Sequence, residues 1–188
     1  MAEQLNIAQG NKDEKYATLF PQIQSVIEDE PDLIARMANV AAMLHETFRF
    51  WWTGFYRVVD TPKQPNDQTT KRPNNQTTKQ PNDQTTKRPN NQQLVLGPFQ
   101  GPLACTRIRR GRGVCGTAWD KDTTQVVPDV NLFPGHIACS SASKSEIVVP
   151  IHDSEGMVVA VLDIDSAELN TFDDTDKEWL EKIAELLS

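Results

Sequence analysis

The sequence lacks the features that mark an exported, membrane-bound or nucleic-acid-binding protein. Its N-terminus has no basic start followed by an apolar run, and no segment is apolar over enough residues to cross a bilayer. The formal net charge is −7, and an acidic surface repels phosphate backbones and anionic lipid. We therefore expect a cytoplasmic protein with no nucleic-acid partner and no membrane partner.

Cysteine is scarce as well, with three residues at positions 105, 115 and 139. Without an export signal these thiols are expected to be reduced, so we expect no disulfide framework. No CxxC or CxxxH spacing is present, so the sequence predicts no metal site. The residues alone leave two interpretations open, either inert buried thiols or reactive ones.

Large apolar side chains are absent from residues 61–92, which repeat an octapeptide such as PNDQTTKR. Such a segment cannot bury enough surface to offset the entropy of ordering it. We interpret it as a disordered insertion between two strands, with a binding tail as the alternative. The rest divides into a flexible N-terminus, residues 1–15, and one domain, residues 16–188, since 188 residues suit a single core.

Apolar periodicity predicts the elements of that domain. Helical spacing runs through residues 16–27 and 33–48, with Pro21 and Pro31 interpreted as first-turn prolines. Strands are expected at residues 52–59, 94–97, 124–127, 146–151 and 157–164, a short helix at 114–119, and a final helix from residues 171–174 to the end. This order predicts an α+β fold in which N- and C-terminal helices pack on one face of an antiparallel sheet.

The cysteines lie in segments that favour reactive thiols. Cys105 and Cys115 lie on either side of a basic cluster, residues 107–112, in a glycine-rich stretch. The cluster holds four arginines, and nearby guanidinium groups lower a thiol's pKa. On the alternative interpretation, these arginines form a solvated turn. Cys139 is flanked by small residues, and His136 and Lys144 would favour its thiolate, so its loop is a candidate nucleophile loop.

Three acids are expected to meet near the end of the last hairpin. Asp163 and Asp165 alternate along a strand and therefore point to one face, and Glu146 begins the partner strand. They either lie solvated at the strand edge or line a pocket that binds an ammonium group, with one acid kept protonated as a proton donor.

Aromatic residues gather at the start of the first predicted strand. Trp52 and Tyr56 share one face with Gly54, and a glycine between two rings would leave a hollow. Core packing is the alternative interpretation.

A series of motifs in order resembles the free methionine-(R)-sulfoxide reductase family, whose fold is a GAF domain. The resemblance covers residues 33–187. Its motifs are WTGFY (52–56), LVLGPFQG (94–101), Ala104-Cys105, GRGVCGT (111–117), VPDV (127–130), PGHIAC (134–139), SEIVVP (145–150), Gly156 and VLDIDS (161–166). The repeat is a departure, because that family joins those two strands by a short turn.

The resemblance implies a thiol enzyme that needs no cofactor. Cys139 would attack the sulfoxide sulfur of free methionine-(R)-sulfoxide and become a sulfenic acid. Cys105 would condense with it, with Cys115 as the alternative resolving thiol, and thioredoxin would reduce the disulfide. Trp52 and Tyr56 would contact the S-methyl group. The acids expected to bind the substrate are Glu146, Asp163 and Asp165. A homodimer is also implied. The rival functions are a non-catalytic GAF ligand-binding module and a redox sensor.

Overall fold

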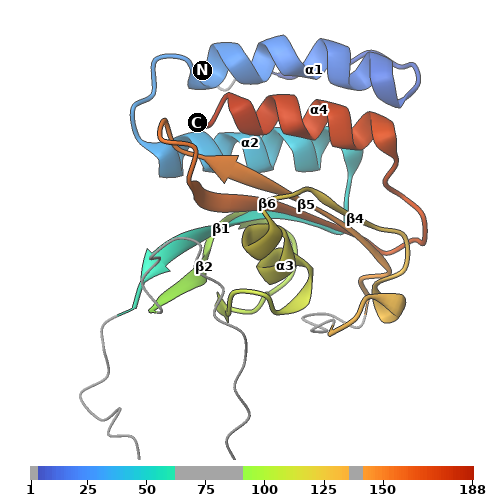
Figure 1. The fold of residues 1–188 in the computed structure, drawn as a ribbon. Coiled ribbons are helices and arrows are strands. Elements are labelled where there is room, and N and C mark those ends of the chain that lie inside the picture. Colours follow the sequence, from blue (N-terminus) through green and yellow to red (C-terminus); the bar gives the residue numbers. More distant parts are fainter. Residues whose placement is uncertain (1–3, 62–90, 136–141) are drawn as a thin grey trace, which may run out of the picture.

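The computed structural model describes residues 4–61, 91–135 and 142–188, which form a sheet with helices on both faces (Figure 1). The helices are α1 (Lys12–Ile27), α2 (Leu33–Phe48), α3 (Gly113–Lys121) and α4 (Asp174–Glu185), with a 3-10 helix, η1, at Val130–Leu132. The strands are β1 (Trp52–Asp60), β2 (Gln92–Gln100), β3 (Arg107–Ile108), β4 (Gln125–Val127), β5 (Ser145–His152) and β6 (Val158–Ser166).

The strands form one sheet in the order β3-β2-β1-β6-β5-β4, and every neighbouring pair is antiparallel. Helices α2 and α4 cover one face, with α1 packed on their outer side, and α3 lies against the other face (Figure 1). The predicted α+β architecture, with terminal helices on one face of an antiparallel sheet, is therefore confirmed.

Each face of the sheet has its own apolar core, because successive side chains of a strand point to opposite faces. Phe55 of β1 and Leu162 of β6 pack under the helical layer, whereas Trp52 and Tyr56 belong to the core on the α3 side. The second face carries the candidate site. No helix in the three described ranges has the length and apolar character needed to cross a membrane.

Helix α1 differs from its prediction at its start. It begins at Lys12, before residue 16, because Asn11 and Glu14 form a capping box. Pro21 therefore lies inside the helix rather than in its first turn. An interior proline costs about 3 kcal/mol, and burial of Leu19 and Ile23 on the helical core offsets that cost.

Two helix boundaries also differ from prediction. Asp32, not Pro31, immediately precedes α2, and its side chain accepts from the Ile34 backbone amide. Helix α4 is capped by Asp173, which forms a capping box with Asp176, whereas Thr171 donates its hydroxyl to Ser166 at 2.7 Å. Several Asp and Thr residues in this stretch are suitable caps, so sequence alone did not select between them.

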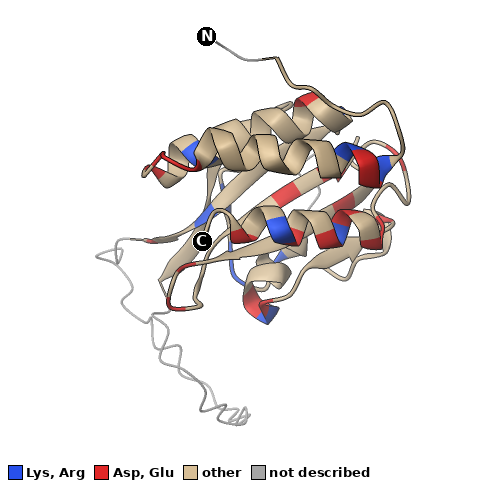
Figure 2. Ribbon diagram, turned by 90° about the horizontal axis from the view of Figure 1, so that it is seen from above, with Lys and Arg blue, Asp and Glu red and all other residues tan. Residues whose placement is uncertain are grey.

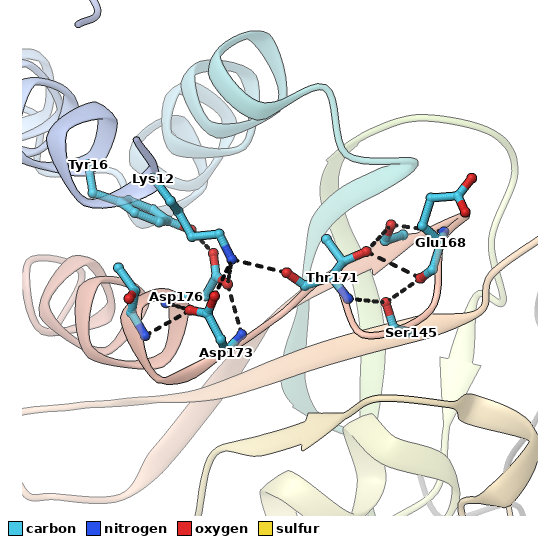
Figure 3. Close-up of polar contacts among 9 residues, drawn as sticks. Lys12, Tyr16, Ser145, Glu168, Thr171, Asp173 and Asp176 are labelled. Carbon is cyan, nitrogen blue, oxygen red and sulfur yellow. Dashed lines mark hydrogen bonds and ion pairs between the residues drawn. The ribbon is translucent and has the colours of Figure 1, made fainter. Parts of the chain in front are cut away.

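A polar cluster joins α1 to the start of α4 (Figure 3). Lys12 Nζ lies 2.9 Å from Asp173 and 2.5 Å from Asp176, and the Tyr16 hydroxyl donates to Asp176 at 3.0 Å. Burial raises the pKa of Tyr16 and that of Asp176. Elsewhere on the helical layer, acidic and basic residues are interspersed, as along α4 in Figure 2.

The predicted insertion falls between β1 and β2. Asp60 pairs with Gln92, and the Thr61 amide donates to the Asn91 carbonyl at 2.7 Å, so the strand ends meet as a hairpin does. The octapeptide repeat itself lies mostly outside the described residues. The two-residue strand β3 was not predicted, because it is too short to produce a periodic pattern.

Candidate active site

A pocket opens on the α3 side of the sheet, with an empty volume of about 610 Å³ that is partly open to solvent. Strands β1, β5 and β6 form its floor, and the start of α3 forms one wall. Residues 101–106, here named the cover loop, contribute Pro102, Leu103 and Ala104. The remaining lining residues are Trp51, Trp52, Tyr56, Ile108, Arg112, Gly113, Val114, Cys115, Ser143, Glu146, Asp163 and Asp165.

The three predicted acids, here named the acid cluster, meet in this pocket. Strand pairing places Glu146 opposite Asp165 and places Asp163 opposite Val148. Because side chains alternate along β5 and β6, all three carboxyl groups reach the same face, as the sequence predicted. Glu146 and Asp163 are each 6% exposed, so the interpretation as solvated strand-edge residues is wrong for these two.

Burial determines the charge state of the acid cluster. It raises the pKa of Glu146 and that of Asp163 well above their ordinary values, and the nearby carboxyl groups add to the rise. Burial also raises the pKa of Asp165, to about 6, against a hydroxyl hydrogen bond from Ser143 that lowers it. Burial therefore favours the neutral forms of Glu146 and Asp163, whereas Asp165, with a pKa of about 6, is mostly ionised at neutral pH.

One oxygen of the acid cluster has no hydrogen-bond partner among the described residues. Asp163 Oδ1 is buried and accepts no hydrogen bond from any residue within the described ranges. A buried polar atom left unpaired costs about 1–3 kcal/mol. Because the atom belongs to a residue that lines the pocket, a bound group is the natural source of its missing partner.

Cys115 lies in the first turn of α3 and faces the acid cluster. Its thiol donates to Glu146 Oε1 at 3.8 Å. Burial and the charges of Asp163 and Glu146 raise its pKa well above the ordinary value. The expectation that nearby arginines lower this pKa is therefore wrong for Cys115, because Arg112 is exposed to solvent while the carboxyl groups lie beside the buried thiol.

Cys105 occupies a different environment. It is partly buried at the end of the cover loop, and it is a free thiol, as is Cys115. The Tyr56 hydroxyl donates to the Cys105 carbonyl at 3.0 Å, and Trp52 Nε1 donates to the Pro102 carbonyl at 3.1 Å. The aromatic residues therefore hold the cover loop at both ends.

Cys139, the predicted nucleophile, and His136 lie outside the described residues. Described residues bracket their segment on both sides. Pro134 and Gly135 precede it, and Ser143, which follows it, lines the pocket.

The aromatic wall exists, but the predicted hollow at Gly54 is filled. Trp52 and Tyr56 are stacked with ring centroids 6.0 Å apart, and Trp52 also stacks on Phe99 at 5.4 Å. A Cβ at Gly54 would lie 2.5 Å from the Trp52 ring and 2.4 Å from Phe99 Cβ. Glycine at 54 thus lets the Trp52 indole pack closely against the strand at this position.

Several pocket residues were not singled out by sequence reasoning. Ser143 is a small polar residue with no motif signal, and only the fold places it against Asp165. Leu103 is 90% exposed, and Trp51 is 38% exposed, yet both line the pocket. Large apolar side chains that are exposed beside a buried site indicate a binding pocket, but that exposure is visible only in the folded structure.

The basic cluster at residues 107–112 has a partly structural role. Arg110 Nε lies 2.8 Å from Asp120, and its guanidinium lies over the Trp119 ring, 5.2 Å from the centroid. These contacts tie the turn before α3 to the end of that helix. The interpretation of a simple solvated turn is therefore incomplete for Arg110.

Among the residues that the structure describes, one group of side chains at the site could hold a metal ion. Ligand atoms of Cys115, Glu146 and Asp163 all lie within 4.8 Å of one another, and all three residues are buried. These three residues, drawn from α3, β5 and β6, are named the buried trio below.

Known proteins resemble this chain over almost its whole length. A family model described as GAF domain matches residues 32–188. A curated relative, GAF domain-containing protein A of Dictyostelium discoideum, is 48% identical over 187 residues, covering 100% of this chain and 99% of the relative. The free methionine-R-sulfoxide reductase of Saccharomyces cerevisiae is 35% identical over 183 residues, covering 95% of this chain and 86% of that enzyme.

Solved structures agree with these matches. The X-ray structure of a free methionine-R-sulfoxide reductase from Neisseria meningitidis, in complex with its substrate, has a TM-score of 0.79 and 45% sequence identity to this chain. The match covers 98% of this chain and 92% of that one.

Proposed function

The chain belongs to the free methionine-(R)-sulfoxide reductase family of GAF domains, and on that premise we propose that it reduces free methionine-(R)-sulfoxide to methionine. The observation that carries the proposal is the acid cluster, which is buried beside a thiol and faces an aromatic wall. The sulfoxide oxygen needs a proton donor, the amino group of a free amino acid needs an anion, and the S-methyl group needs an apolar wall.

Glu146 and Asp163 supply the proton in this proposal. Burial raises the pKa of both groups, which favours the neutral acid, and a neutral carboxyl group can donate to the sulfoxide oxygen. Asp165, with its pKa of about 6, is ionised at pH 7 and binds the substrate's ammonium group. Trp52 and Tyr56 contact the S-methyl group, where a sulfur–aromatic contact contributes about 0.3–1.5 kcal/mol.

Cys139 performs the nucleophilic step. Its sulfur attacks the sulfoxide sulfur, the oxygen is transferred to the cysteine, and methionine departs, leaving a sulfenic acid on Cys139. A second thiol then attacks that sulfenic acid, forming a disulfide and releasing water. The disulfide is reduced by the dithiol of thioredoxin, which is itself oxidised, through thiol–disulfide exchange.

We assign the resolving step to Cys105 rather than Cys115. A resolving thiol must be accessible and must lose its proton, and Cys105 is partly exposed on the cover loop. Cys115 is 4% exposed, and burial together with the neighbouring carboxyl groups raises the pKa of its thiol, which disfavours the thiolate. We place the reaction in the cytoplasm, whose reducing conditions suit a thioredoxin-dependent enzyme. The homodimer stays a prediction, which light scattering of the protein in solution tests.

The decisive assay follows NADPH oxidation with thioredoxin, thioredoxin reductase and racemic free methionine sulfoxide. The proposal expects consumption of about half the racemate, because one epimer fits. No consumption would favour a non-catalytic GAF module, and turnover of peroxide instead would favour a redox sensor.

Rapid-quench measurement of methionine formed per enzyme separates the cysteine roles. Cys139→Ser is expected to form none, whereas Cys105→Ser is expected to give one turnover and then recycle slowly. A full burst from Cys139→Ser would refute its role as nucleophile, and rapid recycling by Cys105→Ser with loss of recycling in Cys115→Ser would reverse the resolving assignment.

A further inference from the structure

We propose that the buried trio of Cys115, Glu146 and Asp163 is a zinc-binding site, at which Zn²⁺ blocks the pocket reversibly. The ion-binding half of this inference stands on the geometry alone. The inhibitory half rests on the proposed function, because it concerns the regulation of that same pocket.

The donor set is the first argument. One thiol and two carboxyl groups offer mixed sulfur and oxygen ligands, which suit zinc and exclude magnesium and calcium, since these bind oxygen alone. Three protein ligands leave a fourth tetrahedral position, and all three residues line the pocket. Water or a substrate group would fill it.

The spacing is the second argument. Zn–S and Zn–O bonds of about 2.3 and about 2.1 Å give a tetrahedral S···O edge of about 3.6 Å. Cys115 Sγ and Glu146 Oε1 are already 3.8 Å apart. All three ligand atoms lie within 4.8 Å of one another, so Asp163 needs to approach by at most about 1.4 Å, which a side-chain torsion supplies.

The unpartnered oxygen of Asp163 points to a ligand independently. Asp163 is 6% exposed and lines the pocket, yet its Oδ1 accepts nothing from the residues that the structure describes. A cation bound by the trio would satisfy that atom. Binding displaces the protons of the thiol and the carboxyl groups into solvent, and the resulting three negative charges face the two positive charges of the ion.

The consequence for the pocket is competition. A zinc ion held by Glu146 and Asp163 removes the neutral acids that the sulfoxide oxygen requires, and it occupies the floor where that oxygen would lie. Zinc is therefore expected to raise KM for the sulfoxide, with restoration by a chelator. Because no electron transfer is involved, the thiols stay reduced throughout.

Cadmium titration of the reduced full-length protein tests the site without any turnover. Ligation by Cys115 is expected to produce the ultraviolet thiolate-to-cadmium charge-transfer band at one equivalent, and zinc is expected to displace it. Cys115→Ser should abolish the band, and Asp163→Asn should keep the thiol but weaken zinc binding by at least about tenfold, since even indirect loss of a ligand's support costs 10–100-fold.

Matched controls are Cys105→Ser and Cys139→Ser, each of which retains the buried trio. Both should keep the band, and circular dichroism checks that each variant is folded. Retention of the band in Cys115→Ser, its loss in Cys139→Ser, or unchanged zinc affinity in folded Asp163→Asn would each overturn the site.

Turnover provides the second, separable readout. Band formation together with a KM that rises with zinc supports the full proposal. Normal turnover with no band would overturn the zinc site and leave the proposed function intact, whereas a band without any sulfoxide turnover would support the site and refute the function. A band with a KM unaffected by saturating zinc would overturn the inhibitory half.

Discussion

Replacing Asp165 with asparagine tests the energetic cost of the acid cluster. Burial raises the pKa of Asp165 from 3.8 to about 6, so the folded state holds this proton more tightly than the unfolded chain does. Between pH of about 4 and about 6 the folded protein therefore carries more bound protons, and its stability falls as the pH rises through that window.

The size of the effect follows from the shift. A shift of one pKa unit corresponds to about 1.36 kcal/mol. The rise from 3.8 to about 6 therefore sets an upper limit of ~3 kcal/mol on the stability lost above pH 6, reduced in practice because the side chain is partly exposed. Asparagine does not titrate, and its carbonyl oxygen still accepts from Ser143.

Asp165→Asn is thus expected to match the parent near pH 4 and to be more stable at pH 8, by up to ~3 kcal/mol. Removing the Asp165 charge also eases ionisation of Asp163 and Glu146, which acts in the same direction. At neutral pH the same variant should lose substrate affinity, seen as a higher KM, because the ammonium group loses its anion.

Urea unfolding monitored by tryptophan fluorescence at several pH values from 4 to 8 measures the difference directly. Glu155→Gln, at the exposed turn between β5 and β6, is the matched control that removes one acid outside the pocket. A stability difference that does not change with pH, or an Asp165→Asn variant less stable than the parent at pH 8, would refute the reasoning.

Three further changes probe the fold around the site. Gly54→Ala is expected to lower the free energy of unfolding by about 1–3 kcal/mol through overpacking, because the added Cβ would lie 2.4–2.5 Å from Phe99 and the Trp52 ring. Chemical denaturation and kcat/KM should both show a loss. Tyr16→Phe leaves buried Asp176 without its 3.0 Å partner, so chemical denaturation should show a loss of about 1–3 kcal/mol with kcat/KM unchanged, since the cluster lies on the other face of the sheet. Deleting residues 62–90 and joining the strand ends by Asn-Gly should leave kcat/KM within about twofold, because the strand ends already pair, and a large loss would give the repeat a catalytic role.

Sequence periodicity was sufficient for the features that depend on local pattern. The apolar faces of α1, α2 and α4 predicted the helical layer, and alternation along β5 and β6 predicted that Glu146, Asp163 and Asp165 share a face. Hairpin connectivity then fixed which strand ends meet, so convergence of the acids followed from chain order.

Features that depend on what covers a residue were not predictable in this way. The sequence places arginines near Cys115, but the distant strands β5 and β6 bring carboxyl groups closer, and burial magnifies their effect on its pKa. Likewise, the indole that fills the space over Gly54 comes from two residues earlier on the same face, and no spacing rule distinguishes a filled hollow from an open one.

The aromatic residues link substrate binding to thiol recycling. Trp52 and Tyr56 contribute their rings to the pocket and their polar atoms to the cover loop, at the Pro102 and Cys105 carbonyls. In the proposed mechanism Cys105 approaches Cys139 after oxygen transfer, so a movement of the cover loop that breaks these bonds would also alter the wall proposed to contact the methyl group. Release of methionine and approach of the resolving thiol are therefore expected to be coupled, and Tyr56→Phe should speed loop movement while weakening substrate binding. Stopped-flow fluorescence of the tryptophans measures the first effect and KM the second; unchanged values of both would contradict the coupling.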